Sequence, residues 1–309
     1  MRAVRNAPPG VKVVDVPDPE GDGVRIKVAS VGICASDLIY LRHGSQEIAG
    51  HEFAGVTDDG VAVAVEAIFG CGSCEQCEKG SYNLCSTTTE QVLGMTVPGG
   101  MSEYFIAPRH VVVPLPDQLA VEDASLVEPA SVAWHTCHIG EVGPHQRVAV
   151  VGGGAIGILA AASAQTMGAP EVAIEVRHPH QAAARERLGA SAPSGQYDLV
   201  LETGGTESSL HRSVELARPG GTVVFIGVFD EIAWPHFEAF KKEVRIVPAL
   251  GYCRHGEQRE FAEVAQMLAA RSDLREMLIT HRFPLEDAPE AFRVAADKSQ
   301  GVFRVVLHP

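Results

Sequence analysis

The sequence lacks several features that define large classes of protein. None of its apolar runs approaches the roughly 20 residues needed to span a bilayer, so we expect no membrane partner. Its first ten residues, MRAVRNAPPG, have no apolar core of the kind found in signal peptides, so a cytoplasmic location is expected. Positive charge is also scarce: the net charge of −14 argues against a nucleic-acid partner. Internal repeats and low-complexity segments are absent too.

Cysteine is present, and its spacing is informative. Four of the seven cysteines fall in the stretch CGSCEQCEKGSYNLC, with the spacing C-x2-C-x2-C-x7-C. Glycines and charged residues within this stretch indicate a surface loop rather than a core strand. Four thiolates suit a tetrahedral zinc ion and leave no position open for a substrate. The sequence therefore predicts a structural zinc site, worth on the order of 10 kcal/mol to the folding of the loop. Its ligands would be Cys71, Cys74, Cys77 and Cys85.

The chain has two different sequence patterns, which together predict an α/β protein of two domains. Residues 1–138 contain short β-branched runs broken by glycine, proline and aspartate, which is typical of a compact, mostly β domain. Residues 139–251 alternate continuous apolar runs with helical segments, which favours a doubly wound parallel sheet covered on both faces. Residues 252–309 add a helix and a mixed tail that ends in a strand-like run.

A glycine-rich stretch in the second region predicts a dinucleotide site. Gly152, Gly154 and Gly157 form G-x-G-x-x-G between the strand-like RVAVV and the helix-like AIGILAAASAQTM. Glycines at these positions permit a tight turn and let a pyrophosphate approach the start of the helix. The same region is short, since only SAPSGQ separates RERLGA from the next strand-like run.

A zinc ion that performs chemistry needs an open position, which the four-cysteine loop does not offer. Three other stretches contain suitable ligands: GICASD, GHE and EPASVAWH. Each of these residues has an ordinary structural explanation when taken alone. Together they supply one thiolate, one imidazole and two carboxylates, enough for three protein ligands and one exchangeable position. These candidate ligands are Cys34, His51, Glu52 and Glu128.

Taken together, these motifs and their order resemble the zinc-dependent medium-chain dehydrogenase/reductases, which include alcohol, polyol and threonine dehydrogenases. The resemblance implies a GroES-like catalytic domain, built from the N-terminal part and the C-terminal tail, with a Rossmann domain between them. It also implies that the missing strand and helix of the trimmed Rossmann unit would lie at a sheet edge.

The resemblance assigns roles to particular residues. Cys34 and His51 correspond to catalytic zinc ligands, with Glu128 in the slot occupied by Glu in polyol and threonine dehydrogenases. Glu52 would be a direct or exchanging ligand, and Ser36 matches the proton-relay hydroxyl. Two further residues have supporting roles: Asp37 is placed to orient a metal ligand, and Arg304 corresponds to a basic residue that reaches the cofactor phosphates.

The end of the second Rossmann strand favours NADP(H) over NAD(H). NAD-specific relatives place an acid there to bind both ribose hydroxyls. The corresponding residue here, the nineteenth after Gly157, is Val176. Glu175 comes one residue earlier and would point to the opposite face of the strand, unless the strand end is loose. Arg177 and His178 follow, and arginine is well suited to bind a 2′-phosphate.

The sequence thus predicts a zinc-dependent enzyme that transfers hydride between a secondary alcohol, polyol or amino alcohol and NAD(P). Its partners would be a small alcohol or ketone and, through the last Rossmann strand, other copies of itself in a homodimer or homotetramer. Two alternatives are a zinc-free type of quinone or enone reductase and a non-catalytic dinucleotide sensor. Both are disfavoured by the presence of Cys34 and His51.

Overall fold

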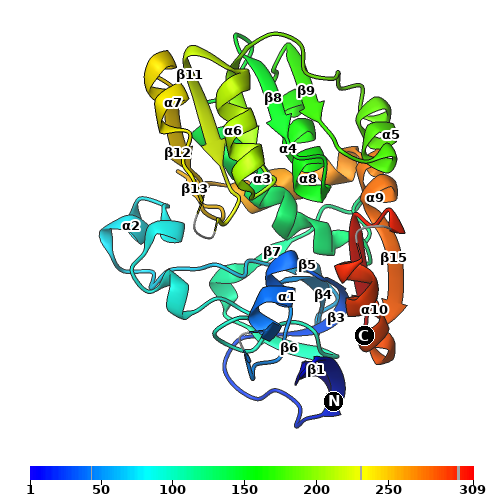
Figure 1. Cartoon of the computed structure of the whole chain (residues 1–309). Coiled ribbons are helices and arrows are strands. Elements are labelled where there is room, and N and C mark those ends of the chain that lie inside the picture. The colour runs from blue at the N-terminus through cyan, green and yellow to red at the C-terminus, as the bar shows by residue number, and fades with distance from the viewer. Residues whose placement is uncertain (43, 230–231, 298–299) are drawn as a thin grey trace. The chain divides into compact units, whose positions relative to one another are not determined.

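The computed structural model describes residues 1–42, 44–229, 232–297 and 300–309 (Figure 1). The chain forms two compact units. The first contains residues 1–128 and 253–309, and the second contains residues 129–252. The change of unit falls at the start of helix α3 (Val127–Ile139), whereas the sequence analysis placed a boundary after residue 138.

The first unit is built around a seven-stranded sheet with the order β15-β16-β3-β4-β5-β7, in which β6 also pairs with β3. The C-terminal strand β16 runs antiparallel to β3, so the chain's tail completes the N-terminal domain. A separate hairpin joins β1 to β2, and a second short hairpin joins β13 to β14. The strands are β1 (Arg2–Ala7), β2 (Gly10–Asp15), β3 (Val24–Gly32), β4 (Glu52–Thr57), β5 (Ala62–Val65), β6 (Tyr104–Ala107), β7 (Val112–Pro114), β13 (Arg254–His255), β14 (Gln258–Arg259), β15 (Ile279–Pro284) and β16 (Arg304–His308).

Short helices surround this sheet. Strand β3 forms in a run rich in β-branched residues. Its Ile26, Val28 and Val31 are buried and join an apolar core that includes Phe53 and Leu307. The helices are α1 (Ala35–Arg42), α2 (Glu75–Glu78), α8 (Glu260–Ala270), α9 (Ser272–Leu278) and α10 (Ala288–Ala296), with 3-10 turns η1 (Tyr82–Leu84), η2 (Thr88–Glu90), η3 (Arg109–Val111), η4 (Ala124–Leu126) and η5 (Leu285–Asp287).

The second unit is a parallel sheet of five strands with the order β12-β11-β10-β8-β9. Its interior strand β8 is buried along Val148–Val151, as expected of a parallel sheet covered on both faces. Helix α4 packs on β8 and β9, and α6 packs on β10 and β11 (Figure 1). The elements are β8 (Arg147–Val151), α4 (Ala155–Thr166), β9 (Glu171–Glu175), α5 (Pro179–Arg187), β10 (Tyr197–Glu202), α6 (Glu207–Leu216), β11 (Ala217–Phe225), α7 (His236–Lys242) and β12 (Arg245–Pro248).

This arrangement confirms the predicted fold class, including the trimmed Rossmann sheet. Strand β9 is at one edge of the sheet, where a further strand would otherwise pair. Part of that edge is covered by Ser191, whose backbone N–H donates to Val172 and whose carbonyl accepts from Ile174. A single residue thus takes up hydrogen bonds that a complete strand would have satisfied. No helix among the described residues has the length and apolar character to cross a membrane.

Candidate metal and cofactor sites

The end of β3 and the start of β4 bring three predicted zinc ligands together. The two strands are antiparallel, with Gly32 opposite Glu52, so the residues just beyond β3 lie beside those just before β4. Their ligand atoms, the thiol of Cys34, a ring nitrogen of His51 and a carboxylate oxygen of Glu52, all lie within 4.8 Å of one another. Residues far apart in the sequence therefore form one compact donor set.

Asp37 holds this donor set in position. Its Oδ2 accepts a hydrogen bond from the backbone N–H of Cys34 at 2.8 Å, and its Oδ1 lies 3.3 Å from His51 Nδ1. A carboxylate at one ring nitrogen fixes the imidazole and leaves the other, Nε2, to act as a ligand. This position is compatible with the orienting role expected from the sequence, which stays a prediction.

The electrostatics of the site favour a thiolate at Cys34. Burial of the thiol opposes its ionisation, but the neighbouring His51 charge and hydrogen bond outweigh it and lower the pKa of Cys34 to about 7. Burial alone would lower the pKa of His51, whereas Asp37 and Cys34 together raise it well above its ordinary value. Without the metal, the protonated His51 thus stabilises the Cys34 thiolate; zinc binding would release the His51 proton, because only a neutral imidazole can be a ligand.

Glu52 is completely buried, which is costly for a carboxylate unless a cation compensates it. Its Oε2 lies against the guanidinium of Arg304, itself buried on β16. Its Oε1 is 4.0 Å from His51 Nε2, and within the described chain neither oxygen accepts a hydrogen bond of normal geometry. Gly32 leaves room for this carboxylate, since a Cβ there would be 2.3 Å from Oε2.

These features fit a zinc ion. A thiolate, an imidazole and a buried carboxylate oxygen without a hydrogen bond are donors that zinc accepts in sites with an open position. The half-buried Ser36 places its hydroxyl oxygen 3.4 Å from His51 Nε2, at the edge of the site. Glu128 is buried in the first turn of α3, but among the described residues it is not a member of this donor group. Its role as a ligand stays a prediction.

The four-cysteine loop forms the second donor set. The sulfur atoms all lie within 4.8 Å of one another, and those of Cys74 and Cys77 are 3.5 Å apart. Two sulfurs bound to one zinc at ~2.3 Å in a tetrahedron are separated by about 3.8 Å. A hydrogen bond with the Thr87 hydroxyl, together with the backbone N–H of Cys71, lowers the pKa of Cys85 to about 5. The loop therefore fits the predicted structural zinc.

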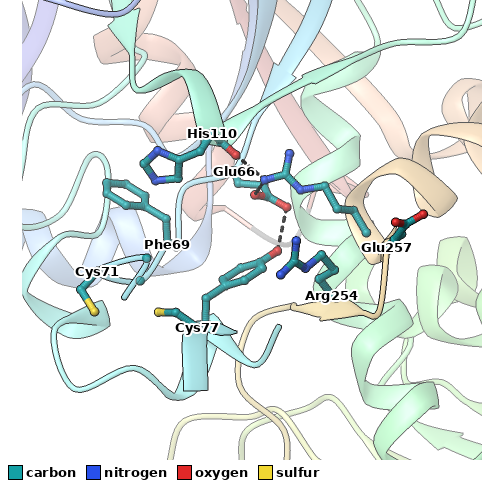
Figure 2. Close-up of a pocket in the computed structure, with 11 residues that line it drawn as sticks. Glu66, Phe69, Cys71, Cys77, His110, Arg254 and Glu257 are labelled. Atoms are coloured by element: carbon teal, nitrogen blue, oxygen red, sulfur yellow. Dashed lines mark hydrogen bonds and ion pairs between the residues drawn. The ribbon is translucent and has the colours of Figure 1, made fainter. Parts of the chain in front are cut away.

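A buried carboxylate connects this loop to the rest of the first unit, beside a cavity of about 410 Å³ (Figure 2). Glu66, just after β5, accepts a hydrogen bond from the Tyr82 hydroxyl at 2.7 Å and pairs with Arg259 at 2.9 Å. Burial raises the pKa of Glu66 to about 7, although Arg259 and Tyr82 act in the opposite direction. The cavity is also lined by Phe69, Gly70, Cys71, Gly72, Cys77, His110, Arg254 and Glu257.

The predicted glycine loop lies between β8 and α4. Gly152 has φ +121°, a conformation that side chains rarely tolerate, and Gly154 is the N-cap of α4. A Cβ at Gly157 would lie 1.8 Å from the carbonyl oxygen of Gly152, so the first turn of α4 packs directly on the loop. A Cβ at Gly154 would meet no atom within 4 Å, so the start of the helix has room for a phosphate, as the motif requires.

The charged residues at and just after the end of β9 bind different partners. Strand β9 ends at Glu175, and Arg177 and His178 are exposed in the turn that follows. Arg177 donates to the hydroxyl of Ser208 at 2.9 Å. Glu175 is held by Arg212, whose Nε lies 3.0 and 2.9 Å from its two oxygens. Sequence reasoning missed Arg212, because it lies on α6 and no short spacing relates it to β9.

Comparison with known proteins agrees with both units. Residues 20–117 match the alcohol dehydrogenase GroES-like domain, and residues 167–300 match the zinc-binding dehydrogenase family. Galactitol 1-phosphate 5-dehydrogenase of Escherichia coli is 30% identical, with 100% of each chain covered. D-xylulose reductase A of Aspergillus oryzae is 30% identical over 91% of this chain and 89% of the relative.

Solved structures show the same similarity. The crystal structure of galactitol-1-phosphate dehydrogenase from Escherichia coli superposes with a TM-score of 0.89 at 28% identity, with 100% of both chains covered. A zinc-binding dehydrogenase from Sinorhizobium meliloti, solved bound to NADP, has a TM-score of 0.86 at 26% identity and covers 100% of this chain and 99% of its own. The chain belongs to the zinc-dependent medium-chain dehydrogenases. It is an oxidoreductase that uses zinc and a nicotinamide cofactor on alcohol substrates.

Proposed function

We propose that this enzyme oxidises a secondary hydroxyl of a polyol, or reduces the corresponding ketone, with a catalytic zinc at Cys34, His51 and Glu52. The convergence of these three donors, oriented by Asp37, carries the proposal. Relatives named as polyol dehydrogenases support the substrate class. A zinc-free reductase would have no use for this buried donor set.

The residues of the site have distinct tasks. When bound, zinc supplies Lewis-acid chemistry at the alcohol oxygen, and the nicotinamide accepts the hydride. Asp37 keeps His51 in the orientation that presents Nε2, and Arg304 balances the buried charge of Glu52. The Ser36 hydroxyl oxygen can accept the alcohol proton and pass it outward, because Ser36 is half-buried whereas His51 is buried.

A screen of polyols, their phosphates and simple secondary alcohols tests this proposal. Oxidation would be followed through cofactor absorbance with both NAD and NADP, and zinc would be measured on the same sample. Turnover that persists after zinc has been removed would contradict the proposal. Cofactor binding without turnover of any alcohol would instead favour the dinucleotide sensor.

We further propose that the cofactor is NADP(H). The carboxylate that would bind the ribose hydroxyls, Glu175, is engaged by Arg212, and Arg177 is exposed immediately after β9. Arginine binds phosphate through several donors in one plane, and its charge persists at every physiological pH. These contacts support a 2′-phosphate site formed by Arg177, with His178 beside it.

Replacing Arg177 with alanine is expected to weaken NADP(H) binding by about 1.5–3 kcal/mol, roughly 10- to 150-fold, because a hydrogen-bonded charge pair is lost. NAD(H) binding should change little, since it has no 2′-phosphate. Fluorescence titration of both cofactors measures this, with Arg187→Ala on α5 as a control for the loss of an exposed arginine. Tighter binding of NAD(H) than NADP(H) by the unmodified enzyme would refute the assignment.

The enzyme is also proposed to be a homo-oligomer. Strand β12 is an edge of the second unit's sheet, and an exposed strand edge is prone to pair with another chain. Large apolar side chains are exposed in the same region of the chain. They are Val228, Trp234, Phe237, Phe240 and Leu250. A second copy that covers β12 and α7 would remove this apolar surface from water.

Light scattering at micromolar concentration should therefore give the mass of a dimer or tetramer. Phe240→Glu is expected to shift the enzyme toward the 32.8 kDa monomer, because Phe240 is 78% exposed and would lie in the interface. Val61→Glu, which replaces an exposed apolar residue of the first unit, should leave the mass unchanged. A monomeric mass for the unmodified enzyme would rule out the assembly.

A further inference from the structure

The hairpin formed by β13 and β14 has two chemically different faces. Arg254 and Arg259 are paired across the hairpin and therefore share one face. Both line the cavity beside the four-cysteine loop, where Arg259 pairs with Glu66 and Figure 2 shows Arg254 next to the same carboxylate. Side chains alternate between the faces of a strand, so the residues adjacent to these arginines point to the other side.

The other face carries a cysteine, a histidine and a glutamate. Cys253 and His255 flank Arg254, and Glu260 follows Arg259 at the start of α8. The sulfur of Cys253 lies 3.4 Å from His255 Nε2, and Glu260 Oε1 lies 3.0 Å from the same nitrogen. Cys253 and Glu260 are buried, whereas the His255 side chain is 37% exposed. None of these residues belongs to the two zinc sites already described.

The geometry distinguishes between two uses of such a trio. In a nucleophilic relay, the thiol and the carboxylate contact opposite nitrogens of the imidazole, so that a proton can be taken up at one and held at the other. Here both Cys253 and Glu260 approach the same nitrogen, Nε2. Three donors that converge on one point are the arrangement of a metal site.

The distances from His255 Nε2 to the Cys253 sulfur and to Glu260 Oε1 also match the distances between ligand atoms of a zinc ion. Bond lengths of ~2.3 Å to sulfur and ~2.0–2.1 Å to nitrogen and oxygen, at tetrahedral angles, place a bound sulfur about 3.6 Å and a bound oxygen about 3.3 Å from the nitrogen. The observed distances are 3.4 and 3.0 Å. In addition, Glu260 Oε2 accepts the backbone N–H of Cys253 at 2.7 Å, which turns Oε1 toward His255.

We infer that Cys253, His255 and Glu260 form a third zinc site, separate from the catalytic and four-cysteine sites. Thiolate and imidazole donors favour zinc over magnesium or calcium, which prefer oxygen ligands. Three protein ligands leave a fourth position for water or another donor. The site joins the β13–β14 hairpin to the first turn of α8. Since the opposite face of this hairpin holds Glu66, the metal would stiffen the support of the four-cysteine loop.

Counting bound zinc tests the inference without reference to activity. Full-length enzyme and its variants would be equilibrated with Zn²⁺, passed through a desalting column and analysed by elemental mass spectrometry and by competition with a metallochromic indicator. His255→Ala should lose one equivalent of zinc relative to the unmodified enzyme. Glu260→Gln, which preserves the shape of the side chain, should lose the same equivalent or bind it at least tenfold more weakly, as expected when a ligand is removed. His145→Ala, at an exposed histidine of the second unit, should lose none.

The partial exposure of His255 makes its alanine variant compatible with folding, which circular dichroism would verify. Unchanged zinc counts and affinities in both His255→Ala and Glu260→Gln would overturn the inference. Combining His255→Ala with Cys34→Ala keeps this test separate from the proposed function. The two losses should add if all sites exist, and the loss due to His255 should persist even if the catalytic site is absent.

Discussion

Replacing Cys34 with alanine is expected to abolish measurable turnover while leaving a folded chain that contains one zinc fewer. The thiol is only half-buried and is not part of the apolar core, so its loss creates little cavity. A Lewis acid contributes several kcal/mol to stabilising developing charge. At ~1.4 kcal/mol per factor of ten, kcat should fall by about 10³-fold or more.

Three measurements check this result together: zinc content, kcat with the best substrate from the screen, and thermal unfolding. Cys137→Ala serves as the matched control, because it removes a buried cysteine of α3 that donates to the carbonyl of Ala160 and belongs to none of the donor sets. The control should keep its zinc and its activity. An active Cys34→Ala enzyme, or one with an unchanged zinc content, would show that the catalytic metal is not held there.

Substitution of Asp37 is expected to have a smaller effect of the same kind as substitution of Cys34. It contacts His51 and the backbone of Cys34 without being one of the three grouped donors. Partners of this kind are worth about 10–100-fold in metal affinity or activity. Asp37→Asn should therefore fall between the unmodified enzyme and Cys34→Ala in both zinc affinity and kcat.

The parts of the fold that follow from periodicity could be predicted from the sequence. RVAVV became β8 because a run of consecutive apolar residues can be buried only where both faces of the strand are covered. The glycine loop after it was predicted for a similar reason, since Gly152 adopts a positive φ and Gly157 is packed against its carbonyl. These local constraints are expressed within a few residues of sequence.

Contacts between distant residues were harder to predict. Arg304 was assigned to the cofactor by resemblance, and the structure places its guanidinium against Glu52 because β16 pairs with β3. The trio at Cys253, His255 and Glu260 gave no signal, because a hairpin of two-residue strands is too short to show a period of two. Such contacts depend on strand order and register, which composition and spacing do not determine.

The second large effect is expected at Cys77 in the four-cysteine loop. This thiol is buried, and a Cβ added at Gly70 would lie 2.3 Å from its sulfur, so the loop is packed closely around the metal position. Structural zinc contributes on the order of 10 kcal/mol, comparable to the whole stability of a typical domain at roughly 5–15 kcal/mol. Cys77→Ala should therefore lose one zinc and unfold the loop, or leave the chain insoluble.

Two hydrogen bonds would still hold part of the four-cysteine loop in Cys77→Ala, so the experiment should detect local unfolding of the loop. The Tyr82 hydroxyl donates a hydrogen bond to Glu66, and the Gly80 carbonyl accepts one from the backbone N–H of Arg254, so both contacts tie the loop to the rest of the first unit. In Cys77→Ala, limited proteolysis should cleave within residues 71–85, and thermal unfolding should begin at a lower temperature. Glu75→Ala, which removes an exposed side chain of α2, should behave like the unmodified enzyme in both assays. A soluble Cys77→Ala protein that resists proteolysis and keeps its full zinc content would show that Cys77 is not a ligand of a structural zinc, because a closed four-thiolate site cannot lose a ligand without consequence.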